Sequence, residues 1–377
     1  MRIKKVAFCD RVLEWRFEPI YFSNLALLVG VSGVGKTQIL KGISRLKEIA
    51  NGASLNGLAW DITFSTIDDD VEYQWQGEFE TKKNPVIIPN QADEASNFRI
   101  VREHLSRNGD TIIERNSTEI KFKGNTTPKL SPFQSAVQIL NQEEDILPVQ
   151  QGFNKIIYSD NLSVSFNEVF GMPHRVISIF STNIFSLDDI KSSNLPILIK
   201  IALIARHHPD TFHEIKRKFI DIFPQIEDIK IEAVENDDNP LFPNFPIQIK
   251  EKSINDWILQ NNISSGMLKT LILISELYLS PQGTVILIDE FENSLGINCI
   301  DVVTDLLTEN RNIQFILTSH HPYIINNISM EYWKIVTRKG GVVTVTDAKD
   351  LNLGKSRHQA FTQLINLEEY SEGIKVE

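Results

Sequence analysis

Residues 25–40 read LALLVGVSGVGKTQIL, an apolar run that leads into a loop with three glycines, one lysine and one threonine. The apolar run 25–29 is typical of a buried parallel strand, and the residues from Lys36 onward are typical of a helix. The loop has the spacing G-x-x-x-x-G-K-[ST], whose glycines let successive backbone N–H groups turn inward around an anion. The helix N-terminus adds the positive end of a dipole at the same place. The stretch therefore predicts a site for the phosphates of a nucleotide.

The residue types of this loop have separate expected roles. Lys36 would reach the β- and γ-phosphates, and the hydroxyl of Thr37 would coordinate Mg²⁺. A glycine-rich turn with a surface lysine is the plain alternative, but the strand before the loop and the helix after it favour nucleotide binding. The expected nucleotide-binding residues are Gly30, Ser32, Gly33, Val34, Gly35, Lys36, Thr37 and Gln38.

A second candidate motif is TVILIDEFENSL at 284–295, where an apolar strand ends in Asp289 and Glu290. Asp289 would hold Mg²⁺ directly or through water, and Glu290 would polarise an attacking water molecule. Acidic pairs at strand ends are common on their own. Together with the phosphate loop, this pair predicts a catalytic site that uses ATP and Mg²⁺.

Two weaker signals lie on either side of the acidic pair. Ser264, Ser265 and Gly266 precede an apolar helix and could form an anion site, although an ordinary helix cap explains the serine equally well. In QFILTSHHPYII at 314–325, His320 or His321 would stand near the γ-phosphate at the end of a strand. The order of the four segments along the chain, rather than either signal alone, supports a shared site.

Periodicity elsewhere predicts an α/β protein. Alternating segments between 58 and 123 predict antiparallel strands, a helix is expected from Ser131-Pro132, and 186–223 predicts two helices broken at His208-Pro209. Alternating strands and helices return in the last third, and no sustained heptads predict a long coiled coil. We expect an ATPase core at 1–50, an antiparallel β insert at 51–130, a helical lobe at 131–240, the rest of the core at 241–350 and a helical tail at 351–377.

Composition limits the classes of function. The 377 residues carry a net charge of −11, so a nucleic-acid contact would need a local basic patch such as KRK at 216–218. Cys9 and Cys299 lie far apart and form neither a disulfide framework nor a zinc site. The apolar stretch 195–205 is too short to cross a bilayer and includes Lys200. We therefore expect a cytoplasmic protein without a membrane partner.

The order of these segments resembles that of the ABC-type ATPases: Walker A, signature, Walker B and a strand-end histidine. The segment 289–295 looks like the DEPEnsLhP form found in SMC-like AAA ATPases akin to the OLD nucleases and the ATPase subunits of the Septu and PARIS anti-phage systems. SSGMLKTL resembles their signature, and TSHHP resembles their TTHSP, which favours His320 over His321. LSPFQSAVQIL resembles their Q-loop segment and makes Gln134 the candidate there. Gly296 and Ile297 depart from the family, which often has His-Pro at this point.

The resemblance implies a P-loop NTPase of the ABC ATPase type, with a mixed sheet core, an antiparallel β-subdomain and a helical lobe. It implies a head-to-tail homodimer or higher oligomer, in which Ser264 and Gly266 of one subunit complete the site of the other. We also expect a separate effector protein, a nuclease or a toxin, because the sequence carries the nucleotide-binding motifs but no second catalytic constellation.

Three functions stay open at this point. The first is a nucleotide-gated switch in anti-phage defence. The second is a DNA-binding repair or recombination ATPase. The third is the ATP-binding half of a transporter. The signature and the DEFEN segment (289–293) argue against this third function.

Overall fold

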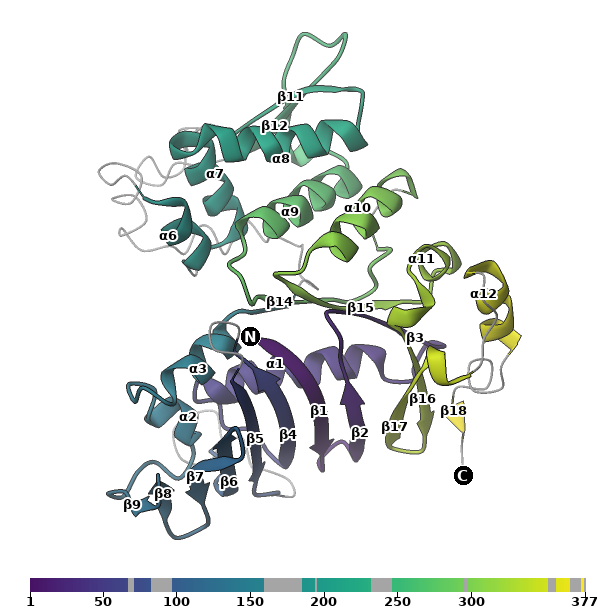
Figure 1. Cartoon of the computed structure of the whole chain (residues 1–377). Helices are drawn as coiled ribbons and strands as arrows, with labels where there is room; N and C mark the ends of the chain where they lie inside the picture. Colours follow the sequence, from purple (N-terminus) through teal and green to yellow (C-terminus); the bar gives the residue numbers. More distant parts are fainter. Residues whose placement is uncertain are drawn as a thin grey trace. The chain divides into compact units, whose positions relative to one another are not determined.

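The computed structural model describes residues 1–66, 71–82, 97–158, 185–193, 195–231, 246–293, 297–351, 357–366 and 374–375. The chain divides into two compact units, coloured along the sequence in Figure 1. The first, which we call the sheet unit, comprises Met1–Ser159, Gln282–Phe291 and Arg311–Glu377. The second, the helical unit, comprises Asp160–Pro281 and Glu292–Asn310.

The sheet unit is built on one sheet, which has 15 strands among the described residues. The strand order is β10-β14-β15-β3-β16-β17-β2-β1-β4-β5-β6-β7-β8-β9, and β18 pairs with β16. The strands are β1 (Arg2–Asp10), β2 (Trp15–Tyr21), β3 (Leu25–Val29), β4 (Leu58–Ser65), β5 (Glu72–Phe79), β6 (Ile100–Arg107), β7 (Asp110–Arg115), β8 (Ile120–Phe122), β9 (Asn125–Thr126), β10 (Ile156–Tyr158), β14 (Val285–Ile288), β15 (Gln314–Ser319), β16 (Trp333–Lys339), β17 (Val342–Asp347) and β18 (Ile374–Lys375).

The two halves of this sheet differ in strand direction and in residue pattern. Strands β10, β14, β15, β3 and β16 run parallel, and the central ones are apolar and buried along their length. Strands β2, β1 and β4 to β9 run antiparallel, and their residues alternate between buried and partly exposed. A parallel strand covered on both faces needs a continuous apolar run, whereas a strand with one open face needs alternation. The strands predicted from the sequence in both halves are confirmed.

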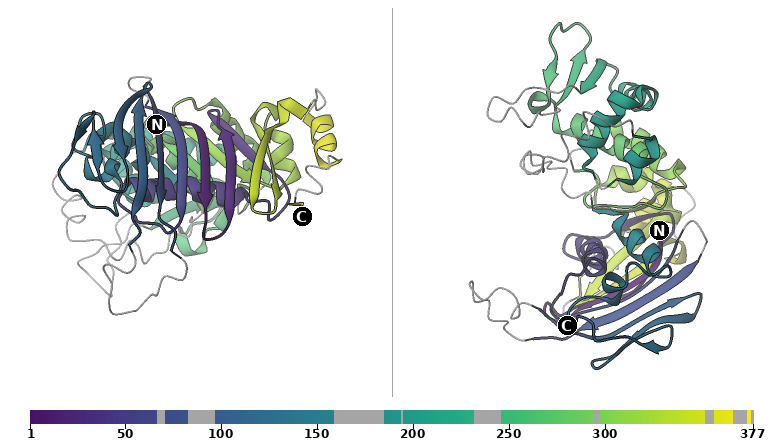
Figure 2. Two further views of the ribbon diagram at one scale, coloured as in Figure 1. Left: turned by 90° about the horizontal axis from the view of Figure 1, so that it is seen from below. Right: turned by 90° about the vertical axis from the view of Figure 1, so that its left-hand side faces the viewer.

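Helix α1 (Lys36–Ala50) packs its apolar stripe against the sheet, and Figure 2 shows it running across the strands. Ile39, Ile43 and Leu46 are fully buried in the same core as Phe8 and Phe17, whose rings stack 5.6 Å apart. The remaining helices of this unit are α2 (Ala136–Ile139), α3 (Leu147–Asn154), α11 (Pro322–Asn327), α12 (Arg357–Asn366) and the short 3₁₀ helices η2 (Met330–Tyr332) and η3 (Ala348–Leu351). The predicted C-terminal helical tail thus contains α12 and, in addition, strand β18.

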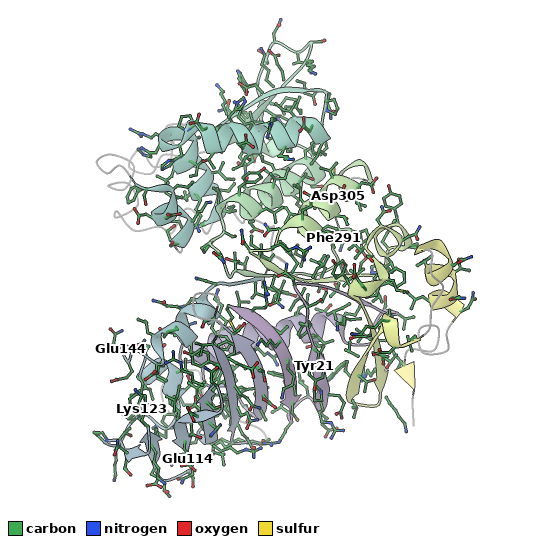
Figure 3. The ribbon with its side chains drawn as sticks, viewed as in Figure 1. Tyr21, Glu114, Lys123, Glu144, Phe291 and Asp305 are labelled. Carbon is green, nitrogen blue, oxygen red and sulfur yellow. The ribbon has the colours of Figure 1, made fainter. Side chains whose placement is uncertain are left out.

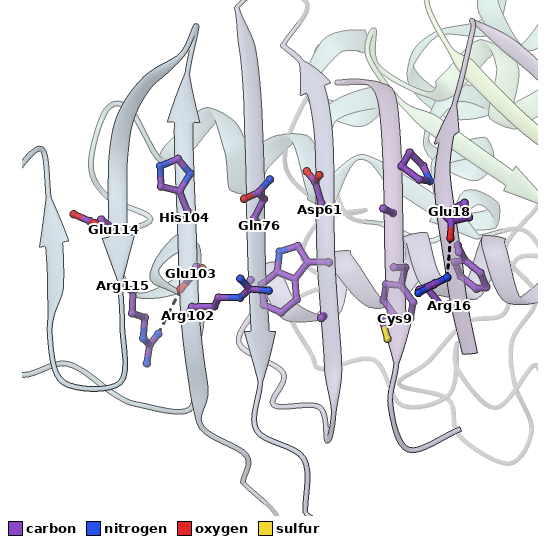
Figure 4. A pocket seen from close by; sticks show the side chains of 17 residues that line it. Cys9, Arg16, Glu18, Asp61, Gln76, Arg102, Glu103, His104, Glu114 and Arg115 are labelled. Carbon is purple, nitrogen blue, oxygen red and sulfur yellow. Dashed lines mark hydrogen bonds and ion pairs between the residues drawn. The ribbon is translucent and has the colours of Figure 1, made fainter. Parts of the chain in front are cut away.

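The helix predicted to begin at Ser131-Pro132 begins later in the structure, and a buried ion pair explains why. Arg115 lies 3.4 Å from Glu103, both side chains are almost fully buried, and Figure 4 draws the contact. Arg115 also donates hydrogen bonds to the carbonyl oxygens of Gln134 (2.7 Å) and Ser131 (3.0 Å). These carbonyls are therefore bound outside a helix, and α2 begins only at Ala136, with Ser135 as its N-cap.

The helical unit contains five described helices and a small antiparallel sheet in the order β11-β12-β13. Its elements are α6 (Leu187–Ser192), α7 (Ile197–His207), α8 (Pro209–Ile222), β11 (Ile226–Ile231), β12 (Ile247–Glu251), β13 (Ile258–Leu259), η1 (Gln260–Asn262), α9 (Ser265–Leu279) and α10 (Ile297–Glu309). The break at His208-Pro209 is confirmed, but 186–223 forms three helices instead of two. Pro196 explains the extra break, because its ring would clash with the carbonyl of Ser192 in a continuous helix.

Two buried charged residues interact electrostatically within the helical unit. Lys200 of α7 donates a hydrogen bond to the carbonyl of Lys191, and burial lowers its pKa to about 8. Burial raises the pKa of Glu276, on α9, to about 7, and the Lys200 charge opposes this rise. Among the described residues, Glu276 Oε2 has no hydrogen-bond partner. The carboxylate form of Glu276 therefore destabilises the folded helical unit.

We expect Glu276→Gln to remove a pH dependence of stability. The folded-state pKa of about 7 exceeds the usual 4.5, so the folded protein holds this proton where the unfolded chain has lost it. The unfolding free energy of the wild type should fall by about 3 kcal/mol as pH rises from about 4.5 to 7. Denaturant unfolding of both proteins at about pH 5 and about pH 7.5 checks this. Equal slopes with pH in the two proteins would contradict it.

Candidate functional site

The phosphate loop joins β3 to α1, and two of its glycines are required by their surroundings. A Cβ on Gly30 would lie 2.6 Å from the carbonyl oxygen of Val336, so only glycine lets the loop pass this strand. Gly35 has a left-handed φ of 106° at the N-cap of α1, and a Cβ there would lie 2.9 Å from the Trp15 ring. Strand, tight loop and helix are thus arranged as the spacing of the motif predicts.

Lys36 is the first residue of α1 and folds back over the loop. Its Nζ donates hydrogen bonds to the carbonyl oxygens of Gly30 (2.7 Å) and Val31 (3.0 Å), and the residue is 8% exposed. The first turn of α1 carries no acidic side chain, so no carboxylate competes for the helix N-terminus. This arrangement holds one positive charge where an anion would approach the loop.

The other loop residues differ in exposure. Ser32 and Gly33 are exposed, whereas the Val34 side chain is fully buried and could contact a ligand only through its backbone. Thr37 and Gln38 lie half-buried in the first turn of α1.

The acidic pair lies at the same edge of the sheet as the phosphate loop. Parallel pairing sets Ile288 of β14 opposite Leu317 of β15, and Ser319 of β15 opposite Val29 of β3. The carboxyl ends of the three strands therefore lie side by side. Asp289 and the phosphate loop are brought together with β15 between them, although 252 residues separate Asp289 from Thr37 in the sequence.

Glu290 has an unusual backbone conformation. Its φ is 45°, in the left-handed region, which costs about 1–3 kcal/mol for a residue other than glycine. The next residue, Phe291, is labelled in Figure 3; it is 2% exposed, and its N–H donates to the carbonyl of Thr318 at 2.9 Å. The chain therefore turns sharply at Glu290 between a buried strand and a buried aromatic side chain.

The two histidines after β15 have different surroundings. His321 is the N-cap of α11, where its Nδ1 accepts a hydrogen bond from the Tyr323 N–H at 3.2 Å. His320 is exposed directly at the end of β15. The exposure of His320 and the capping role of His321 therefore make His320 the stronger candidate for a ligand contact at the strand ends.

The signature residues lie in the helical unit. Ser264 is the N-cap of α9, its Oγ accepts from the Met267 N–H at 3.3 Å, and the Gly266 carbonyl accepts from Thr270 at 2.7 Å. Within the same unit, Lys269 donates to the Asn293 carbonyl of the DEFEN segment. Ser294, Leu295 and Gly296 lie outside the described residues.

The structure does not bring Gln134 to the phosphate loop. Its Nε2 lies 3.2 Å from the position of a Cβ on Gly52, just beyond the C-terminal end of α1. The phosphate loop is at the other end of this 15-residue helix, about 22 Å away along its axis. The Arg115 hydrogen bond to the Gln134 carbonyl helps to hold the segment there.

The structure also shows two residues near the site, Thr318 and Arg338, that sequence reasoning missed. Thr318, in β15, hydrogen-bonds to both acidic residues. The Arg338 guanidinium stacks 4.0 Å over the Trp15 ring and lies 3.4 Å from the Gly33 carbonyl of the phosphate loop. The only signal for Thr318 was a hydroxyl residue at the end of a strand, and strand-end hydroxyls are common.

Other candidate ligand sites are less persuasive. A hollow of about 600 Å³ opens on the sheet face away from α1 and is lined by polar and apolar residues of six antiparallel strands (Figure 4). Ion pairs such as Arg16–Glu18 and Lys5–Asp61 already neutralise much of its charge. In the basic run 216–218, Lys216 pairs with Asp228 and Arg217 with Glu214, which suits a solvated helix face.

Thr37 and Asp289 supply a hydroxyl and a carboxylate, the hard oxygen ligands that Mg²⁺ prefers. Among the described residues, no group of three or more His, Cys, Asp or Glu side chains could hold a metal alone. Mg²⁺ in nucleotide sites takes one or two protein oxygens and completes its shell with phosphates and water. The residues present therefore fit Mg²⁺ that arrives with a nucleotide.

The fold is similar to that of solved SMC head domains. One similar structure is an SMC head bound to the C-winged helix domain of ScpA, with a TM-score of 0.52, 16% sequence identity, and 92% of this chain and 97% of that chain covered. Another is an Smc head domain with an extended coiled coil, from Pyrococcus furiosus, bound to the C-terminal domain of ScpA; the TM-score is 0.50, the identity 14%, and the coverage 92% and 96%. The chain has the fold of an SMC head domain.

This likeness confirms the predicted fold class: a mixed sheet with a helical lobe and, in the part of the chain described, no long coiled coil. Residues 176–326 match a family model described as "AAA domain, putative AbiEii toxin, Type IV TA system". The match includes Ser264, the acidic pair and His320 but not the phosphate loop. No curated protein matches the sequence. No helix of the described residues is long and apolar enough to cross a membrane.

We expect Lys36→Ala to weaken the binding of Mg²⁺–ATP by about 30-fold or more, because loss of one partner of a buried charge pair costs at least about 2 kcal/mol. Titration calorimetry measures the change. Lys41→Ala is the matched control, because Lys41 is an exposed lysine of the same helix. Equal ATP affinity in wild type and Lys36→Ala would rule out the phosphate-binding role.

Proposed function

We propose that this chain binds and hydrolyses ATP with Mg²⁺, and that it acts as a nucleotide-gated switch for a separate effector in anti-phage defence. The observation that carries the ATPase part is the alignment of three strand ends. It sets the phosphate loop with Lys36 beside the Asp289–Glu290 pair. The SMC head fold supports the same conclusion.

In this proposal, the residues of the site have separate roles in phosphate binding and in hydrolysis. The loop amides and Lys36 bind the phosphates, with Lys36 exchanging its carbonyl contacts for phosphate oxygens. Glu290 orients the attacking water and takes up its proton, and His320 contributes a polar group at the strand ends. Thr37 and Asp289 would hold Mg²⁺, which would supply positive charge to offset the charge that develops on the phosphates.

We expect Glu290→Gln to bind ATP as the wild type does but to hydrolyse it about 10²–10⁴-fold more slowly, because the phosphate contacts remain while the base is lost. The variant should therefore accumulate an ATP-bound dimer. Single-turnover ATPase assays and light scattering measure the two effects, and Glu309→Gln, an exposed glutamate at the end of α10, is the control. Wild-type turnover in Glu290→Gln would exclude this role.

The effector part of the proposal rests on a physical requirement and on the family match. Hydrolysis changes nothing outside the site unless the ATP-bound and ATP-free states bind something differently. The description of the matched family includes a toxin of a type IV toxin–antitoxin system, which supports a defence role and a two-component arrangement. A head-to-tail dimer would let Ser264 and Gly266 complete the site of a second copy.

The alternative is a DNA-binding repair or recombination ATPase of the SMC-like class, which the SMC head fold favours. The net charge of −11 and the paired basic run 216–218 argue against a broad DNA surface. Two experiments separate the functions. ATPase assays with and without DNA test for stimulation, and expression alone or with the product of the adjacent gene tests for protection during phage challenge.

We expect protection only when the neighbouring gene product is present, and little stimulation by DNA. Strong stimulation of the ATPase by DNA would favour the repair function. Full protection by this chain alone, with nuclease activity in the purified protein, would refute the partner model.

A further inference from the structure

The hydroxyl of Thr318 contacts both members of the acidic pair at once. Its Oγ1 donates a hydrogen bond to Asp289 Oδ1 at 2.5 Å and accepts one from the Glu290 N–H at 2.8 Å. The residue is 1% exposed and sits in β15, between the strands that carry the phosphate loop and the acidic pair. One buried hydroxyl thus links a side chain and a backbone group across two strands.

These contacts fix two features that the strand pairing alone leaves open. The bond to Oδ1 sets the rotation of the Asp289 carboxylate, and this bond does not involve Oδ2. The bond from the Glu290 N–H, with that from the Phe291 N–H to the Thr318 carbonyl, holds the left-handed turn at Glu290. The φ of 45° sets the direction of the Glu290 Cα–Cβ bond, from which the side chain with its carboxylate extends.

We propose that Thr318 is a positioning residue that sets the directions of the Asp289 and Glu290 carboxylates before substrate arrives. The inference rests on the proposed ATPase function, because only there do the two carboxylates act on a substrate. Valine has nearly the same shape as threonine, but the methyl group that replaces the hydroxyl can neither donate nor accept, so Thr318→Val removes both side-chain hydrogen bonds with little change in side-chain volume. Serine keeps the hydroxyl.

The first measurement needs no nucleotide. Hydrogen exchange of the Glu290 amide should be slow in the wild type, faster in Thr318→Val and slow again in Thr318→Ser. Thr304→Val is the matched control: Thr304 is a buried threonine of α10, 4% exposed, whose Oγ1 has no hydrogen-bond partner among the described residues. It should leave the Glu290 amide as protected as in the wild type.

The second measurement is steady-state ATPase kinetics on the same proteins. Thr318→Val should lower kcat by about 10–100-fold, as loss of a partner that orients a metal ligand does, with the KM for ATP close to that of the wild type. Thr318→Ser should restore most of kcat, and Thr304→Val should not change it. A merely structural role would instead lower stability and raise KM, with no rescue specific to serine.

The outcomes distinguish a failure of the Thr318 proposal from a failure of the proposed ATPase function. A wild type without ATPase activity overturns the proposed function itself. An active wild type whose kcat is unchanged by Thr318→Val, or unchanged exchange of the Glu290 amide in that variant, overturns only the role of Thr318. If Thr318→Val does not fold, Thr318→Ala gives the same comparison, because it also lacks the hydroxyl.

Discussion

Strand β15 pairs in parallel with β3 on one side and with β14 on the other, and the geometry of the site depends on this double pairing. The backbone hydrogen bonds fix the register, so Val29 lies opposite Ser319 and Ile288 lies opposite Leu317. A shift of one residue in either pair would move Asp289 by about 3.3 Å along the strand direction relative to the phosphate loop. The observed register holds the polar residues that follow the three buried runs at one edge of the sheet.

The same constraint explains why the groups at this edge bind each other. A lysine charge and a carboxylate near a buried sheet edge must be hydrogen-bonded, since an unpaired buried polar group is costly. Lys36 is satisfied by the carbonyls of Gly30 and Val31, and Asp289 by Thr318. In the function that we propose, a phosphate bound by Lys36 would replace these carbonyl contacts with stronger, charge-assisted hydrogen bonds. The hydrogen bonds of Lys36 and Asp289 hold both side chains in defined positions.

The sequence predicted those features that depend on neighbours along the chain. The phosphate loop, the acidic pair and the strands around them are encoded by local spacing and periodicity, and the strand–loop–helix geometry follows that spacing. It did not predict features that depend on distant contacts. The start of α2 is set by Arg115, whose hydrogen bonds to the carbonyls of Ser131 and Gln134 reach across 16 and 19 residues. The hydrogen bond between Thr318 and Glu290 joins residues 28 positions apart, and the hydrophobic periodicity of the sequence does not predict such a pair.

Ser264 shows how a structural and a functional interpretation can both hold for one side chain. As the N-cap of α9, its oxygen accepts a hydrogen bond from the Met267 N–H. Accepting this bond uses a lone pair and leaves the hydroxyl proton to be donated. In the dimer that we propose, a phosphate oxygen of a nucleotide on a second copy would accept this proton, and the helix dipole of α9 would favour the same anion. The capping bond is compatible with that role, so an ordinary helix N-terminus and a signature motif need not be alternatives.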